Sequence, residues 1–303
     1  MRHLLLFRHI DEVVKSGSIR KAAEVLAITP SALNRQILAV EEELGVQIFE
    51  RLPRGVRLST AGELLVHHIR NQVSDFVRLQ SQIADLSGVR RGHVSIACSQ
   101  ALLPYFLPKQ IERYRGDHPG VTFSVAVRDR EAAEQSLVDY SSDVALIFEP
   151  VRLADCQTLL TIRQPIHAVL AADHPLANKE QLGLEDIIAF PLALPSLPYG
   201  VRSLLDAAAS RKNIQLQAAI QSDSFEFLRH VVHHGHTITF QIEIGLPMPD
   251  EVDLGVVRRP LRGRDVPPGR LHLTQLKGRS LPVAAARFAD QLQSTFAQHF
   301  ECI

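Results

Sequence analysis

Apolar residues in the first 45 positions recur at steps of three and four, which is the period of a helix that buries one face. The first such helix is predicted from the apolar positions Leu6, Phe7, Ile10, Val13 and Val14. A second, short helix is predicted over residues 19–26, after Ser18 as N-cap, and a third over residues 30–44. Two short helices joined by a tight turn are the helix-turn-helix arrangement of many DNA-binding proteins.

The third helix has clear start and stop signals. Thr29 can cap it, Pro30 suits its first position because the N–H that proline lacks would be unpaired there, and Gly45 suits its end. The side chains around the starts of the two short helices are polar and give the candidates for contact with DNA: Ser18, Thr29, Ser31, Asn34, Arg35 and Gln36.

Arginines crowd the segment that follows this helix. Residues 46–49 and 56–58 are predicted to be two short strands, and Arg51, Arg54 and Arg57 lie in or beside the turn between them. A basic hairpin beside a recognition helix is a wing, suited to phosphates or to a narrow minor groove. The alternative is a small helical domain with a solvated basic loop.

A seven-residue repeat of mostly apolar residues follows over residues 60–87. Its positions, at alternating steps of four and three, are Leu65, Ile69, Gln72, Phe76, Leu79, Ile83 and Leu86. Such a repeat is typical of a coiled coil, so we expect a long helix that pairs with a helix of a second copy of the chain. The alternative is an amphipathic helix packed on its own C-terminal domain.

Strands and helices alternate in the remaining two-thirds of the chain. Strands are predicted at residues 93–98, 121–127 and 144–148, with helices at 102–114 and 131–139 between them. The second half adds strands at 167–171, 217–221, 236–240 and 271–276 and helices at 225–234 and 284–300. This order predicts an α/β domain whose sheet is mostly parallel and carries helices on both faces.

Five short segments, in order and with the usual spacing, resemble the N-terminal signature of LysR-type transcriptional regulators. They are residues 18–26, 32–37, 41–45, 48–51 and 57–62, and segments 118–121, 143–147 and 174–177 resemble the same family further along. Pro30 stands where the family commonly has glutamine, and Asn34 where serine is usual. These two departures concern which DNA sequence is recognised and leave the expectation of DNA binding unchanged.

The resemblance implies three parts. Residues 1–59 would form a winged helix-turn-helix domain, residues 60–88 a dimerisation helix, and residues 89–303 a two-lobed α/β effector domain similar to periplasmic solute-binding proteins. Lobe I would comprise residues 93–163 and 267–303, and lobe II residues 164–266. The partners so implied are double-stranded operator DNA, a small-molecule inducer, a second chain in a homodimer that goes on to a homotetramer, and RNA polymerase.

Ligands of open α/β sheets bind beyond the carboxyl ends of the strands. This rule selects as candidate effector-binding residues Ser99, Gln100, Arg128, Phe148, Glu149, Ser196, Arg202 and Phe240. By resemblance, Ser99 stands where many family members hold the inducer with a serine or threonine. Arg202 lies in the first turn of a predicted helix, and its positive charge favours an organic anion as the effector. Neither a cofactor nor a metal is expected.

Composition changes this picture only when the chain is divided. The 303 residues include 33 Lys and Arg and 33 Asp and Glu, a net charge of zero that taken whole argues against nucleic acid. Residues 1–92, however, carry 13 basic and 10 acidic side chains, so a weakly basic part precedes a weakly acidic one. No apolar run approaches the roughly 18 residues that span a bilayer, and no secretory cleavage site follows the N-terminus. We therefore expect a cytoplasmic protein without a membrane partner.

Other kinds of site find weaker support. His230, His233, His234 and His236 cluster without a nearby carboxylate or cysteine motif, which disfavours a metal centre. Nothing indicates that Cys98 and Cys156 form a redox pair, and no local motif would make Ser99 a nucleophile, so no enzyme activity is expected. A solute-binding protein that does not regulate through DNA remains as the alternative function, against which the helix-turn-helix pattern argues.

Overall fold

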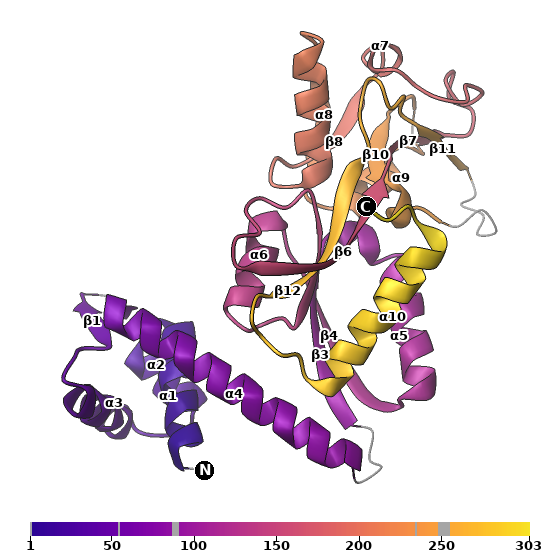
Figure 1. Cartoon of the computed structure of the whole chain (residues 1–303). Coiled ribbons are helices and arrows are strands. Elements are labelled where there is room, and N and C mark those ends of the chain that lie inside the picture. The colour runs from indigo at the N-terminus through magenta and orange to yellow at the C-terminus, as the bar shows by residue number, and fades with distance from the viewer. Residues whose placement is uncertain (1, 54, 87–90, 234, 248–254) are drawn as a thin grey trace. The chain divides into compact units, whose positions relative to one another are not determined.

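The computed structural model describes residues 2–53, 55–86, 91–233, 235–247 and 255–303 (Figure 1). It divides into two compact units, Met1–Ile83 and Ala84–Ile303, each of which is described by itself. Within the described ranges, no helix combines the length and the apolar character needed to cross a membrane.

The N-terminal unit consists of three helices, a two-stranded hairpin and a long fourth helix. Its elements are α1 (Arg2–Ser16), α2 (Ile19–Val25), α3 (Pro30–Leu44), β1 (Phe49–Leu52), β2 (Gly55–Leu58) and α4 (Thr60–Leu86). Ala22 and Ala23 of α2 are fully buried against Ile10 and Leu33, because alanines let neighbouring helices approach closely. The helices expected from the apolar pattern are therefore present, and α2 and α3 form the helix-turn-helix.

In this unit one local expectation is met only in part and another is wrong. Ser18 occupies the N-cap position of α2 but its side chain makes no capping hydrogen bond. The first strand of the hairpin begins at Phe49 rather than at Val46, because the Val46 amide still bonds to the Glu41 carbonyl at the end of α3 (3.2 Å). The Glu41 carboxylate then accepts bonds from the amides of Ile48 (2.7 Å) and Phe49 (3.1 Å), which fixes the entry to the hairpin.

A five-stranded mixed sheet forms the first half of the C-terminal unit. Its strands, in the order β4-β3-β5-β12-β6, are β4 (Gly120–Val127), β3 (Arg91–Cys98), β5 (Val144–Phe148), β12 (Gly269–Leu276) and β6 (Cys156–Gln164). Helices α5 (Phe106–Asp117) and α10 (Val283–His299) cover one face and α6 (Arg130–Val138) covers the other (Figure 1). A short 3₁₀ turn, η1 (Gln100–Leu102), follows β3.

A second sheet forms the other half of this unit. In it β7 (Ile166–Ala171) lies between β10 (Thr239–Ile242) and β11 (Val256–Pro260). The pair β8 (Leu192–Pro195) and β9 (Ala218–Ser222) joins it through a bridge between Leu192 and Ile238. The remaining elements are α7 (Leu184–Ile187), α8 (Gly200–Arg211), α9 (Phe225–Val231) and the 3₁₀ turn η2 (Glu243–Gly245).

The expectation of a mostly parallel sheet is met in both halves, with one reversed strand in each. Strands β3, β4 and β5 are parallel, but β12 pairs antiparallel with both β5 and β6, and β7 pairs antiparallel with both of its neighbours. The chain passes from the first sheet to the second after β6 and returns at β12. Strand β6 runs in the same direction as β3, β4 and β5, and β12 runs against them. The result is a two-lobed domain, with one lobe around each sheet.

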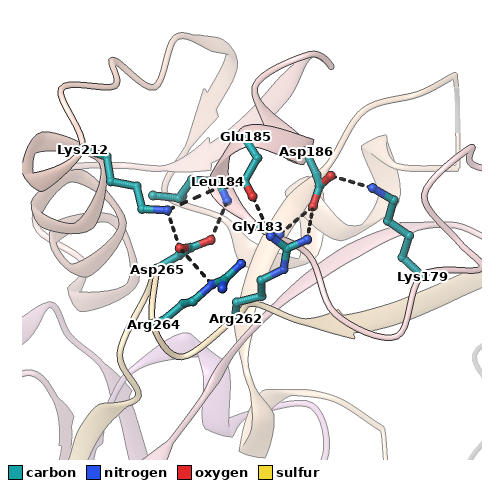
Figure 2. Close-up of polar contacts among 9 residues, drawn as sticks. All are labelled: Lys179, Gly183, Leu184, Glu185, Asp186, Lys212, Arg262, Arg264 and Asp265. Atoms are coloured by element: carbon teal, nitrogen blue, oxygen red, sulfur yellow. Dashed lines mark hydrogen bonds and ion pairs between the residues drawn. The ribbon is translucent and has the colours of Figure 1, made fainter.

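Ion pairs join the segment that returns to the first sheet with α7 and the end of α8 (Figure 2). The Asp265 side chain is only 2% exposed and bonds to the Lys212 ammonium at the end of α8. Arg262 reaches Glu185 (2.6 Å) and Asp186 (3.2 Å) of α7. These contacts fix the end of the second lobe just before the chain leaves it.

Candidate DNA-binding and effector-binding sites

The start of α3 presents an exposed polar face. Thr29, Ser31, Arg35 and Gln36 are exposed, while Asn34 and Ser18 are half-buried. The Thr29 hydroxyl caps the helix by accepting a hydrogen bond from the Ala32 amide (3.2 Å). Arg35 forms no hydrogen bond or ion pair with another described residue, so its guanidinium is available to a partner.

Two of these side chains are positioned by other elements. The Gln36 side-chain oxygen lies 2.6 Å from Nδ1 of His9, a residue of α1 that is only 6% exposed. The Asn34 side-chain oxygen accepts a bond from Arg51 of the hairpin (3.2 Å), which ties α3 to the wing. Sequence reasoning missed His9, because nothing in the local pattern of α1 shows that this histidine faces a residue 27 positions further on.

The wing carries its basic groups together with an acidic one. Arg57 is paired across the hairpin with Glu50, and the two side chains form an ion pair (2.5 Å). The hydrogen bond that Arg57 donates to the Glu50 carboxylate raises the pKa of the Arg57 guanidinium. Glu50 was missed, although the register of the predicted hairpin would have found it. The predicted contact Arg54 lies outside the described residues.

The seven-residue repeat of α4 divides into two halves with different surroundings. Leu65 and Ile69 pack into the core of the N-terminal unit, and the Arg70 side chain bonds to Asp11 of α1 (2.8 Å). Further along, the Leu79 and Ile83 side chains are 48% and 55% exposed. The polar position Gln72 is also exposed, and the side chain of Leu86 lies outside the description. The first half of the repeat therefore holds α4 to its own unit, and Leu79 and Ile83 in the second half are exposed apolar residues.

A narrow cleft lies between the two sheets of the C-terminal unit. Three predicted residues line it, namely Ser99, Arg128 and Phe148. Asp129, Tyr199 and Gly200 also line it, and the lining that sequence reasoning missed includes Arg130, Phe225 and Ile242. The free volume is about 10 Å³, roughly that of one water molecule, so the two lobes lie close together.

Arg130, the first residue of α6, bridges the cleft. Its guanidinium donates to the carbonyl of Glu149 (2.9 Å) in its own lobe and to the Pro198 carbonyl (3.0 Å) and Ser203 hydroxyl (3.0 Å) in the other. Close by, Gly200 approaches Phe148 so closely that a Cβ atom would lie 2.5 Å from the Phe148 carbonyl oxygen. The lobes are thus in direct contact at the start of α8.

Gln100 makes a second set of bonds between the lobes. Its side-chain oxygen accepts from the amide of Phe225 (3.0 Å), and its side-chain nitrogen donates to the Tyr199 hydroxyl (3.3 Å) and to the Asp223 carbonyl. The predicted residue Gln100 is therefore placed at the junction of the lobes, although it borders a neighbouring cavity rather than the narrow cleft.

Four other predicted effector residues do not line this cleft. Glu149 turns away and its carboxylate accepts from the Arg270 amide (2.7 Å). Arg202 points along its own helix, where it forms an ion pair with Asp206 (2.7 Å). Ser196 lies at the end of β8 with its backbone bonded to Ser222, and Phe240 is buried and borders the neighbouring cavity. The rule that ligands bind beyond the ends of strands thus identifies the correct edge of the sheet. It does not identify which side chains at that edge point into the cleft.

Cys98 and Cys156, for which no sequence feature indicated a redox pair, lie in different environments. Burial raises the pKa of the Cys98 thiol to about 12 and that of Cys156 to about 11. Cys98 packs on the α5–α10 face of the sheet and Cys156 on the α6 face, three strands apart. For the histidine cluster, His234 lies outside the description, and no group of three or more His, Cys, Asp or Glu in the described ranges could hold a metal ion.

A helix-turn-helix with a basic wing, together with a two-lobed domain that encloses a cleft, defines a DNA-binding protein with a ligand-binding domain. The family described as "Bacterial regulatory helix-turn-helix protein, lysR family" matches residues 4–63, and the "LysR substrate binding domain" matches residues 87–297. The chain therefore belongs to the LysR family of transcriptional regulators. Members of this family bind operator DNA and effectors and act as oligomers.

Individual relatives agree with this assignment. The chain is 24% identical to the HTH-type transcriptional activator CmpR of Synechocystis sp. over 229 residues, which are 76% of this chain and 75% of the relative. Its fold is similar to that of full-length OxyR from Pseudomonas aeruginosa, with a TM-score of 0.72, 21% identity, and coverage of 96% of this chain and 94% of that chain. It is also similar to full-length CbnR complexed with its target DNA, with a TM-score of 0.59, 17% identity, and coverage of 96% and 99%.

Proposed function

We propose that α3 enters the major groove of operator DNA and that the wing contacts the adjacent phosphates. Arg35 carries this proposal, because it is exposed at the start of α3 and no described side chain competes for its guanidinium. An arginine in that position can read guanine through its O6 and N7 atoms. Thr29, Ser31 and Gln36 would add base or phosphate contacts, and Arg51 and Arg57 phosphate contacts.

The same proposal gives the chain its organisation. Residues 1–59 bind DNA, residues 60–88 pair two chains, and residues 89–303 bind the effector, with lobe I at 93–163 and 267–303 and lobe II at 164–266. The exposed apolar side chains of Leu79 and Ile83 on α4 support a homodimer. The proposal also includes assembly of two dimers into a homotetramer and contact of the regulator with RNA polymerase. The protein would act in the cytoplasm, where its DNA is, and would regulate rather than catalyse.

The effector would be a small organic anion bound between the lobes. An anion entering the cleft would take the guanidinium of Arg130 away from the Pro198 carbonyl and the Ser203 hydroxyl and would replace these bonds by charge-assisted ones. Ser99 and Arg128 line the same space. A ligand that binds one arrangement of the lobes better than another shifts the population toward it, and the paired chains would transmit that shift to the DNA-binding units.

Fluorescence anisotropy with a labelled fragment from the region upstream of the chain's own gene tests the DNA-binding part of the proposal. We expect retention of this fragment over unrelated DNA of the same length, with an affinity that falls steeply as salt rises, because phosphate contacts release counterions. If the chain prefers no fragment from the DNA around its own gene even at low salt, the DNA-binding proposal is overturned. Ligand binding by the C-terminal domain would then be the remaining function.

A further inference from the structure

A further cavity in the C-terminal unit is distinct from the cleft and from the neighbouring cavity that Gln100 borders. It is formed by α5, the end of α10, η2 and β11, and it encloses about 370 Å³. None of its lining residues borders the cleft that contains Arg130. Its size falls within the range of small-molecule sites, which is roughly 300–1,000 Å³. The two helices that flank it, α5 and α10, lie side by side on one face of the first sheet (Figure 1).

The interior of this cavity is apolar and partly aromatic. Phe106, Ile244 and Leu246 border it although each is buried, and Phe300 adds a second ring. The Phe106 ring lies edge-on to the Phe300 ring, with centroids 6.5 Å apart. Such walls favour a flat or branched apolar group.

The rim of the cavity is basic. Lys109, Arg113, Arg258 and His299 line it, against Glu243 as the one acidic residue of the lining. Arg113 forms no ion pair with another residue of the described chain, and Arg258 donates to the backbone carbonyl of Pro247 (3.0 Å) rather than to a carboxylate. An anion at the rim would therefore meet a surplus of positive charge.

An amide side chain adds a hydrogen-bond donor to the wall of the cavity. Gln110 borders the cavity and is only 8% exposed. Its side-chain oxygen accepts from Thr295 (3.1 Å) and Gln291 (3.2 Å), but its side-chain nitrogen has no acceptor among the residues that the structure describes. This nitrogen is not one of the fully buried unpaired atoms of the described residues, so it keeps some exposure and can donate to a ligand in the cavity that Gln110 borders.

We propose that this cavity is a second ligand site, which binds a small amphipathic anion such as an aromatic carboxylate. The ring lies among Phe106, Ile244 and Phe300, and the carboxylate lies at the rim between Arg113 and Arg258. Helices α5 and α10 belong to the first lobe, whereas η2 and β11 belong to the part of the chain around the second sheet, so a bound anion contacts both lobes. Binding itself does not depend on the proposed function; only its consequence for DNA binding does.

The test uses 4-bromobenzoate with the full-length chain, because the bromine can be located by anomalous scattering. We expect a bromine peak among the three apolar side chains and saturable binding in calorimetric titrations without DNA. Arg113→Gln should weaken this binding about tenfold through the loss of a charge-assisted hydrogen bond. The control Arg115→Gln, an exposed residue on the same helix that does not line the cavity, should leave the affinity unchanged.

Three results would overturn the second site. They are a bromine peak confined to the cleft beside Arg130, equal effects of the Arg113→Gln and Arg115→Gln substitutions, and a peak in crystals without saturable binding in solution, which would mean binding at crystal concentration only. Loss of DNA binding by the whole chain would contradict the proposed function but would leave these titrations unaffected, so the two failures can be told apart.

Discussion

Arg128 and Arg130 are two positions apart but have different roles in the effector domain. Arg128 is exposed and donates to the adjacent Val127 carbonyl (3.0 Å), whereas Arg130 connects the two lobes. A polar residue just after a strand is easily found in a sequence, and Arg128 was selected on that ground. The acceptors of Arg130 lie 19, 68 and 73 positions away, so only the folded chain shows that its side chain reaches them.

Replacement of Arg130 by glutamine should loosen the contact between the lobes. The three hydrogen bonds of the guanidinium would be lost, and we expect amide hydrogen exchange around Ser203 at the start of α8 to become about tenfold faster. Hydrogen-exchange mass spectrometry of the full chain measures this change. Arg128→Gln is the matched control, and equal exchange in the two variants would contradict the assigned role of Arg130.

Two arginines of the N-terminal unit should affect DNA binding in different ways. Arg35→Ala should reduce the preference for the operator over a mutated operator by about 1–3 kcal/mol, because a base contact is lost. Arg57→Ala should weaken binding to both DNAs equally and lower the salt dependence by about one counterion. Anisotropy titrations at several salt concentrations separate these effects, and the same loss of discrimination in both variants would rule out the assigned roles.

At the scale of elements, helix α4 shows what the repeat could and could not predict. The steps of four and three indicated a long helix with an apolar seam, and the structure has that helix from Thr60 to Leu86. They did not reveal that Leu65 and Ile69 would pack within their own unit, because the core of that unit comes from α1, α2 and α3. The exposed part of the seam, at Leu79 and Ile83, is therefore the part available to a partner.

A charge in the exposed part of the seam should separate the dimer. Ile83→Glu would place a carboxylate in an apolar helix pairing, and we expect the dimer to weaken at least about tenfold in sedimentation equilibrium. Leu64→Glu serves as the control, since Leu64 lies outside the seam and is 73% exposed. If both variants remained as dimeric as the unchanged chain, pairing through this part of α4 would be wrong.

Strand prediction succeeded where the apolar pattern was strong. The buried strand β5 was expected with its exact bounds, and β3, β4 and β12 within two residues. The strands β6, β8 and β11 were missed. Strand β6 has no regular alternation of buried and exposed positions, and β8 has only four residues. The antiparallel pairing of β12 could not be inferred either, because it depends on the chain leaving the first sheet and returning to it.

The ion pairs at the end of the second lobe predict a dependence of stability on pH. Burial alone would raise the pKa of Asp265, but the hydrogen bonds from Lys212 and the Leu184 amide and the charges of Lys212 and Arg264 together outweigh this effect and lower the pKa. A carboxyl whose pKa is lowered in the folded state stabilises the fold above about pH 4, and this stabilisation is lost as the pH falls through the folded-state pKa.

Asp265→Asn should therefore lower stability at pH 7 by about 2 kcal/mol. The difference from the unchanged chain should shrink as the pH falls from about 4, where the unfolded-state carboxyl becomes protonated, through the lower folded-state pKa of Asp265. Because the chain has no tryptophan, thermal unfolding is followed by circular dichroism. Asp117→Asn, at the exposed end of α5, should have little effect, and a pH-independent difference for Asp265→Asn would contradict the explanation.

At the scale of the whole molecule, net charge was a poor guide to function. A chain with 33 basic and 33 acidic side chains gives no indication of a nucleic-acid partner, whereas the placement of Arg35, Arg51 and Arg57 around one helix and one hairpin does. The order of helices and strands, together with the resemblance to the LysR family, was enough to predict a regulator with two kinds of site. The identity of its effector could not be predicted, because the lining of the cleft comes from segments far apart in the chain.

The central claim is that the chain recognises specific DNA as a pair of winged helix-turn-helix units. DNase I footprinting of the region upstream of its own gene, in the presence of excess unrelated DNA, tests this claim most directly. We predict two protected half-sites whose centres lie about 10 base pairs apart or a multiple of that, and the loss of this pattern in Arg35→Ala. Uniform cleavage at every protein concentration, or protection that spreads without defined edges, would contradict the account.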